Sequence, residues 1–111
     1  MITFTQQKLT DEALQPSQNL PDQVSWALLA EAGDYKVEYV KWQPGTVYAP
    51  HEHLDTEYIF LFSGDLSDGN TEFERCSLVT YPPGSRHENL RTQTGAEFIL
   101  IWTGRERVKK F

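Results

Sequence analysis

Apolar and polar residues alternate along parts of the chain with the period of two that is typical of β-strands. Between residues 35 and 39 the apolar positions are separated by Lys36 and Glu38, which predicts a strand with one buried face. Val40 and Trp42 then move the apolar pattern to the opposite parity, and we expect a bulge or bend there. The apolar positions of the first stretch are Tyr35, Val37 and Tyr39.

Further short segments rich in β-branched and aromatic residues follow, bounded by glycine, proline or aspartate. Residues 57–63 and 97–103 are the clearest of these strands, and no segment of helical length shows helical periodicity. Many short strands with Gly and Pro turns predict an all-β fold, either a sandwich or a small barrel. The remaining expected elements are strands at 24–30 and 78–81 and turns at 31–34, Pro44-Gly45, Gly64, Asp68-Gly69 and Pro82-Pro83-Gly84.

The length of 111 residues predicts a single domain. Residues 1–23 are polar and contain Pro16 and Pro21, which is typical of an arm or an extended strand. We expect residues 24–104 to form the barrel and residues 105–111 to form a basic tail. We interpret the basic residues of this tail as a solvated strand end.

Acidic residues exceed basic ones by 16 to 10, giving a net charge of -6, and this argues against a nucleic-acid partner. No apolar stretch is long enough to cross a membrane, and the first eight residues do not resemble a signal peptide. The single cysteine, Cys76, excludes an intramolecular disulfide. We therefore expect a cytoplasmic protein without a membrane partner, in which Cys76 is a small buried apolar residue.

All three histidines of the chain fall into one pattern with a glutamate. His51 and His53 lie two positions apart, which puts both rings on one face of a strand. Glu57 follows four residues later, and His87 comes directly after the Pro-Pro-Gly turn. Imidazole nitrogens and a carboxylate oxygen are suitable ligands for zinc, iron, manganese, nickel or copper. The pattern predicts one divalent metal ion bound by these four side chains.

The glycines and prolines around these residues resemble the two motifs of the cupin superfamily. The first motif includes Gly45, the two histidines 51 and 53, Glu57 and Gly64, and the second is the segment 82–87 that ends at His87. The resemblance covers roughly residues 35–103 and implies a jelly-roll-type β-barrel with the four ligands above. Two positions depart from the second motif, because Cys76 stands where a glycine is usual and Arg91 where an asparagine is usual.

Within the cupins, the chain looks most like the ChrR-type group, the metal-binding domain of an anti-sigma factor. The two sequence segments that carry this likeness are residues 64–68 and residues 81–87. The resemblance implies two functions. One is a small metalloenzyme, dioxygenase-like, that acts on a small oxygenated substrate. The alternative is a non-catalytic module that senses or binds a small molecule. The sequence identifies no catalytic acid or base, and the alternatives stay open here.

Other side chains near the motifs have a structural and a functional interpretation. Arg86 adjoins a predicted ligand, but its strand parity points it away from the interior. Most of the nearby aromatic residues should be core, with one or two of them in contact with a ligand. These aromatic residues are Trp42, Tyr48, Tyr81, Phe98 and Trp102.

The strand at 57–63 also predicts a surface for assembly. Because Glu57 faces the metal, Ile59 and Leu61 should share its inward face, and the residues between them should face outward. Outward aromatic side chains would form an apolar patch typical of an interface. We expect a homodimer through this face, unless the arm 1–23 covers it. The outward residues are Tyr58, Phe60 and Phe62.

Overall fold

The computed structural model describes residues 4–103 and 108–110. Over these residues all regular secondary structure is β-strand except one short 3-10 turn, η1 (Asp11–Ala13). No helix in the described ranges is long and apolar enough to cross a membrane. The strands are β1 (Gln15–Pro16), β2 (Val24–Ala32), β3 (Tyr35–Trp42), β4 (Val47–Tyr48), β5 (His51–His53), β6 (Glu57–Gly64), β7 (Ser67–Asp68), β8 (Thr71–Glu72), β9 (Ser77–Tyr81), β10 (Arg86–His87), β11 (Leu90–Arg91), β12 (Ala96–Thr103) and β13 (Val108–Lys110).

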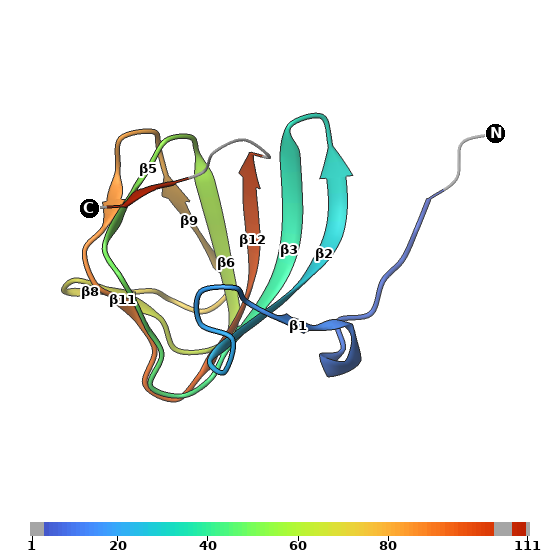
Figure 1. Ribbon diagram of the computed structural model, residues 1–111, viewed down its shortest axis with the longest axis horizontal. Coiled ribbons are helices and arrows are strands. Elements are labelled where there is room, and N and C mark those ends of the chain that lie inside the picture. Colours follow the sequence, from blue (N-terminus) through green and yellow to red (C-terminus); the bar gives the residue numbers. More distant parts are fainter. Residues whose placement is uncertain (1–3, 104–107, 111) are drawn as a thin grey trace.

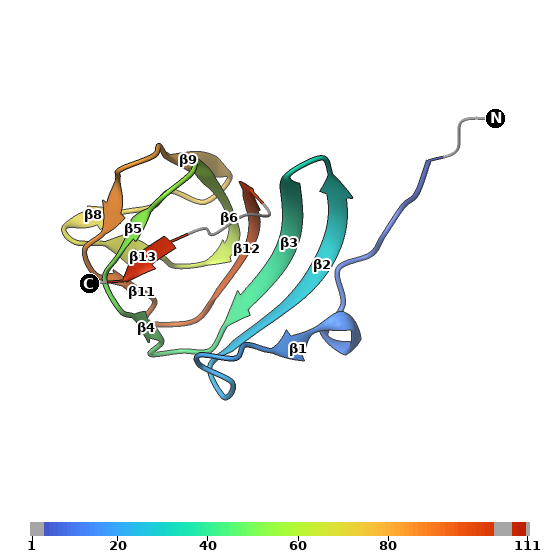
Figure 2. The ribbon, with the colours of Figure 1, turned by 45° about the horizontal axis from the view of Figure 1, so that its top comes forward.

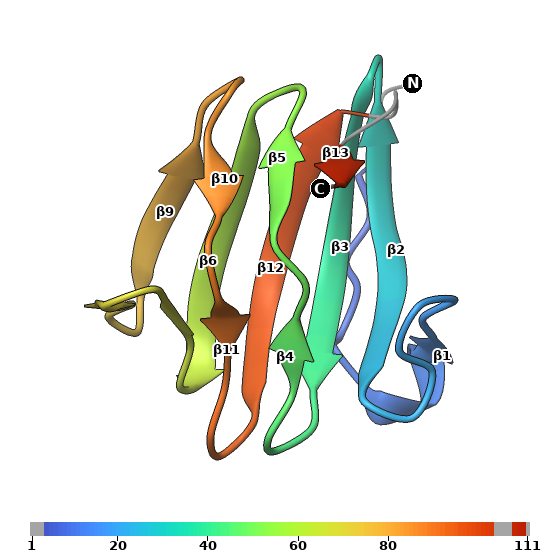
Figure 3. The same cartoon turned by 60° about the vertical axis from the view of Figure 1, so that its left-hand side comes forward.

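The long strands form one curved sheet, and the short strands lie across from it (Figures 1 and 3). The long sheet has the order β1-β2-β3-β12-β6-β9 within the described residues. Facing it are the sheets β10-β5-β13 and β4-β11-β7-β8. All pairings among the described strands are antiparallel, and Figure 2 shows the short strands curving across from the long sheet. The all-β class expected from the sequence is confirmed.

The core fills the space between the two layers. Ile59 and Leu61 on β6 are almost fully buried, as the strand parity predicted. Burial of each such side chain contributes roughly 1.5–3 kcal/mol. The other core residues come from both layers and are Val24, Val40, Trp42, Leu66, Tyr81, Leu90, Ala96, Phe98 and Leu100.

The predicted change of face within residues 35–42 is wrong. β3 pairs with β12 in unbroken register along its whole length, so it contains no bulge. Lys36 and Glu38 therefore share the inward face with Val40 and Trp42. Both line a cavity, and Lys36 also reaches Glu31 at 3.8 Å. This cavity explains why the inward pattern looked polar over part of the strand. Tyr39, on the opposite face, is buried beside the ring of Phe62 and donates to Glu97.

The turn that precedes β9 contains a second correction. Cys76 is exposed, not buried, and its backbone takes a positive φ of 63°. This conformation is easiest for glycine, the residue usual at this position of the motif. The Cys76 N–H donates to the carbonyl oxygen of Leu61 at 2.7 Å, so the turn stays hydrogen-bonded to β6.

The N-terminal arm runs along β2 and β3. β1 pairs with β2, and the Lys41 ammonium bonds the carboxylate of Asp11 at 3.0 Å. The outer aromatic row on β6 is half-buried rather than fully exposed, because it lies beside side chains of the neighbouring strands. This outer aromatic row comprises Tyr58, Phe60 and Phe62. Of the predicted basic tail, β13 pairs with β5, and residues 105–107 and 111 lie outside the described residues.

Candidate metal centre

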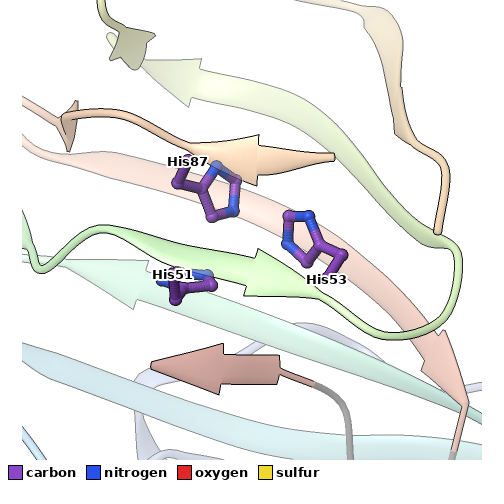
Figure 4. Close-up of side chains that lie close together, drawn as sticks. All are labelled: His51, His53 and His87. Carbon is purple, nitrogen blue, oxygen red and sulfur yellow. The ribbon is translucent and has the colours of Figure 1, made fainter. Parts of the chain in front are cut away.

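The three histidines come from two paired strands of the short layer. His51 and His53 stand on one face of β5, and both are buried. His87 lies on β10 directly opposite His51 in the antiparallel register. The extended backbone thus places all three rings on the interior side, where Figure 4 shows them gathered between β5 and β10.

The turn before His87 is tied to β5 by its backbone. Ser85 N–H donates to the Pro82 carbonyl at 3.0 Å, which closes a tight turn. Gly84 has a φ of +87° and donates its N–H to the carbonyl of His53 at 2.8 Å. The His53 N–H donates in return to the carbonyl of Ser85 at 2.7 Å. The predicted turn at Pro82-Pro83-Gly84 is therefore confirmed, and the His87 ring that follows it is buried.

The three rings lie close enough for one ion. The centroid of the His87 ring is 4.4 Å from that of His51 and 4.5 Å from that of His53, and the other two centroids are 5.3 Å apart. One nitrogen of each ring lies within 4.8 Å of one nitrogen of each of the others. The buried triad can therefore hold a metal ion.

The hydrogen bonds around the rings determine which nitrogen of each is bare. His51 Nδ1 lies 2.9 Å from the carbonyl oxygen of Ala49, which can only accept, so this nitrogen must donate. Ser85 Oγ gives its own proton to the Pro82 carbonyl at 2.6 Å, so it accepts from His53 Nδ1, 3.4 Å away. These two rings therefore carry their proton on Nδ1 and leave Nε2 bare, as metal ligation requires.

Glu57 lies beside the triad, at the inner end of β6. Its Oε1 is 3.3 Å from His53 Nε2 and 3.4 Å from His87 Nε2, and the residue is 2% exposed. His53 Nε2 is buried with no hydrogen-bond partner. Bare nitrogens that converge with a carboxylate in a buried site repel one another unless a cation lies between them. The donor set therefore fits a divalent ion, and direct ligation by all four side chains stays a prediction.

A cavity of about 580 Å³ adjoins the triad. His51, His87 and Glu57 form part of its wall, and Lys36 and Glu38 line it as well. Residues 17–19 of the arm also line the cavity, and the Asn19 amide donates to the Tyr48 hydroxyl at 3.3 Å. Most of the remaining wall is apolar and consists of Val24, Trp26, Leu28, Val40, Trp42, Ile59, Leu90, Phe98, Leu100 and Trp102.

Four of the five aromatic residues singled out from the sequence border this cavity, and the expectation that one or two of them contact a ligand stays a prediction. The exception, Tyr81, packs against the rings of His53 and His87 at 4.8 and 4.2 Å between centroids. Its hydroxyl donates to Asp68 at 2.7 Å. Arg86 points outward and pairs with Glu88 at 2.8 Å, as its parity predicted.

Burial favours the neutral form of the His51 imidazole. Burial lowers the pKa of His51 to about 4, against an ordinary value of 6.5, and the neighbouring His87 acts in the same direction. Burial raises the pKa of Tyr81, and its bond to Asp68 adds to the effect. Burial alone would raise the pKa of Asp68, but hydrogen bonds from Asn89, His87, Tyr81 and Glu88 outweigh it and lower the pKa.

Sequence reasoning missed Asp68 and Ser85 as neighbours of the ligands. Asp68 looked like a turn residue because the following glycine gives a strong turn signal. It does adjoin a turn, but its side chain reaches His87, which is nineteen positions away in sequence. Such a contact has no local periodicity, so only the segment 64–68 that carried the family likeness pointed to it.

Comparison with known proteins agrees with this geometry. The family described as the ChrR cupin-like domain matches residues 5–107. A search of the curated proteins gave no match.

Several solved structures share the fold. An acetylacetone dioxygenase from Acinetobacter johnsonii superposes with a TM-score of 0.77 at 16% identity, over 93% of this chain and 76% of that one. The polyketide cyclase RemF from Streptomyces resistomycificus gives 0.73 at 14% identity, over 96% and 85%. The DMSP lyase DddQ from Ruegeria pomeroyi gives 0.64 at 20% identity, over 90% and 56%. Identities this low show a common fold alone. With the family match over nearly its whole length, the chain belongs to the ChrR cupin-like domain family of the cupin superfamily.

Proposed function

We propose that this cupin is a metal-dependent enzyme of dioxygenase type that acts on a small oxygenated molecule. The observation that carries the proposal is the position of the buried triad His51, His53 and His87 beside a cavity of about 580 Å³. Pockets of roughly 300–1,000 Å³ are typical of small-molecule sites. A triad that only stabilised the fold would not need such a cavity beside it.

The cavity walls indicate the kind of substrate. His51, His87 and Glu57 provide one set of polar groups, Lys36, Glu38 and residues 17–19 provide another, and indole, phenyl and aliphatic groups make up most of the rest of the wall. A divalent ion held by the triad would supply a Lewis acid for substrate oxygen atoms. The apolar wall would exclude water and hold the carbon body of the substrate. Glu57 is placed to bind the ion or to accept a proton at Oε1. We infer a substrate with oxygen donors at one end and an apolar or aromatic body.

The structural neighbours give this proposal limited support. One of them is named an acetylacetone dioxygenase, and another a DMSP lyase. These names show that the shared fold carries more than one chemistry, and fold alone does not determine function.

The second candidate is a binding or sensing module without turnover. The observation that favours it is the match to the ChrR cupin-like domain family over residues 5–107. Resemblance to that group implies a sensor, and the same cavity would then hold a metabolite without converting it.

Oxygen uptake distinguishes these functions. The Fe(II)-loaded protein is mixed with small diketones, catechols and thiols, and His87→Ala treated identically is the control. The enzyme proposal expects uptake in the wild type and its loss in the variant. Equal uptake in both would attribute the reaction to free iron. No uptake, together with a higher melting temperature on addition of one compound, would support the sensor instead.

A further inference from the structure

The carboxylate of Asp68 meets His87 on the side of the ring away from the cluster. Its Oδ2 lies 2.8 Å from Nδ1 of His87 and 2.7 Å from the hydroxyl oxygen of Tyr81. Its Oδ1 accepts the backbone N–H groups of Glu88 and Asn89, each at 2.9 Å. The side chain is 9% exposed. Four donors thus hold this carboxylate in one orientation.

The sheet register places Asp68 at this point. Asp68 on β7 pairs with Leu90 on β11, three residues after His87. The same pairing brings the backbone N–H groups of residues 88 and 89 within reach of Oδ1. The chain between β10 and β11 is therefore fixed to the carboxylate that contacts the imidazole.

The three histidines differ in what faces their outer nitrogen. His51 meets a backbone carbonyl and His53 a serine hydroxyl, whereas His87 meets a charged carboxylate. Asp68 already accepts from two backbone N–H groups and from the Tyr81 hydroxyl, and an ionised carboxylate has no proton to donate. His87 must therefore place a proton on Nδ1. Nε2 of this ring then faces the cluster, where Glu57 Oε1 lies 3.4 Å away. Hydrogen bonds to a charged partner are also stronger than those to neutral ones.

We propose that Asp68 is a positioning residue that fixes His87 in the Nδ1–H tautomer and keeps Nε2 available for the ion. The inference rests on the proposed metal function and assigns this site a residue outside the predicted ligand set. Asp68 acts through His87 and does not bind the ion itself. Partners of this kind orient a ligand and increase its basicity.

The substitution Asp68→Asn separates the tautomer from the fold. The Asn oxygen can still accept the backbone N–H groups of Glu88 and Asn89, so the segment between β10 and β11 keeps these two hydrogen bonds. The Asn amide nitrogen would face His87 as a donor, and a donor there selects the tautomer with the proton on Nε2. The control is Asp65→Asn, which removes a carboxylate that caps the adjoining loop but does not contact a histidine. Asp65 divides its backbone donors between its oxygens, with Gln93 N–H on Oδ2 and Thr94 N–H on Oδ1, so the melting temperature of this variant is measured alongside.

Long-range ¹H–¹⁵N spectra of the metal-free protein at about pH 8, above the ordinary histidine pKa, report which nitrogen is protonated. We expect Nδ1–H on His87 in the wild type and in Asp65→Asn, and Nε2–H in Asp68→Asn. Zn²⁺ affinity, measured by competition with a chelator, should fall by about 10–100-fold in Asp68→Asn and stay unchanged in Asp65→Asn.

Two results would overturn the inference. One is a wild-type His87 without a proton on Nδ1, a measurement that does not depend on any variant folding. The other is a folded Asp68→Asn protein with wild-type Zn²⁺ affinity. If the wild type shows Nδ1–H yet binds no Zn²⁺, Fe²⁺ or Ni²⁺, the metal function fails while the control of the tautomer by Asp68 is supported.

Discussion

Acidification of the metal-free protein should lower its free energy of unfolding through His51. Burial lowers the pKa of this imidazole to about 4 in the folded chain, from an ordinary value of 6.5. As the pH falls below 6.5, the unfolded chain binds a proton at His51 that the folded chain does not yet accept. The contribution is therefore fully present above pH 6.5 and is lost progressively as the pH falls toward 4.

The magnitude follows from the two pKa values. Their separation of 2.5 units corresponds to roughly 3 kcal/mol, at about 1.36 kcal/mol per unit. The residue is only 4% exposed, so screening by solvent reduces this little. Against a typical domain stability of about 5–15 kcal/mol, the loss is large. Asp65 does not add to the pH dependence above about pH 4. Burial would raise its pKa, but hydrogen bonds led by that from Thr94 lower it to about 2. The stability that Asp65 contributes is therefore lost only below about pH 4.

Urea unfolding in the presence of a chelator at pH 7, 6, 5 and 4 measures this effect. His51→Gln cannot titrate, so its stability should vary less with pH. We expect the difference in unfolding free energy between wild type and variant to shrink by roughly 3 kcal/mol from pH 7 to pH 4. A difference that is the same at both pH values would refute the reasoning. Bound metal should steepen the wild-type dependence, because protons compete with it for the imidazoles.

The remaining predictions concern metal content, the backbone and assembly. Protein purified without added metal should contain one divalent ion per chain, and His87→Ala should lose it; unchanged stoichiometry by metal analysis would contradict the proposed ligand. Gly64→Ala should lower the melting temperature much more than Gly45→Ala. Both glycines have φ above +80°, but only at Gly64 would a Cβ collide with a backbone carbonyl. Equal losses in the two variants would exclude the collision as the cause. We also propose a homodimer through the outer aromatic row, which Phe60→Lys should convert to a monomer; light scattering at micromolar concentration would place the interface elsewhere if the variant stayed dimeric.

Local patterns in the sequence identified much of the site. Two histidines at spacing two must share a face of an extended strand, and the buried pair on β5 confirms it. The Pro-Pro-Gly segment ends β9 and reverses the chain, because proline cannot donate to a ladder and Gly84 adopts positive φ. These features depend on a few adjacent residues, so they can be recognised without a tertiary structure.

Strand β3 shows what a local hydrophobic pattern cannot predict. Lys36 and Glu38 looked like the solvent side of a strand, but both line the cavity. A strand pattern shows which positions share a face, but it does not show whether that face meets solvent or an internal cavity. The cavity is formed by strands from both layers together with residues 17–19 of the arm, so no single segment predicts it.

The sequence by itself determined the all-β class, the paired histidines and the turn that precedes His87. The tertiary structure decided that Glu57 lies 3.3 Å from His53, that a cavity adjoins the triad, and that Asp68 meets His87. The physical reason is the range of the interactions. Side-chain parity and turn conformations are set by neighbouring residues, whereas these contacts arise from the register of strands that are distant in sequence.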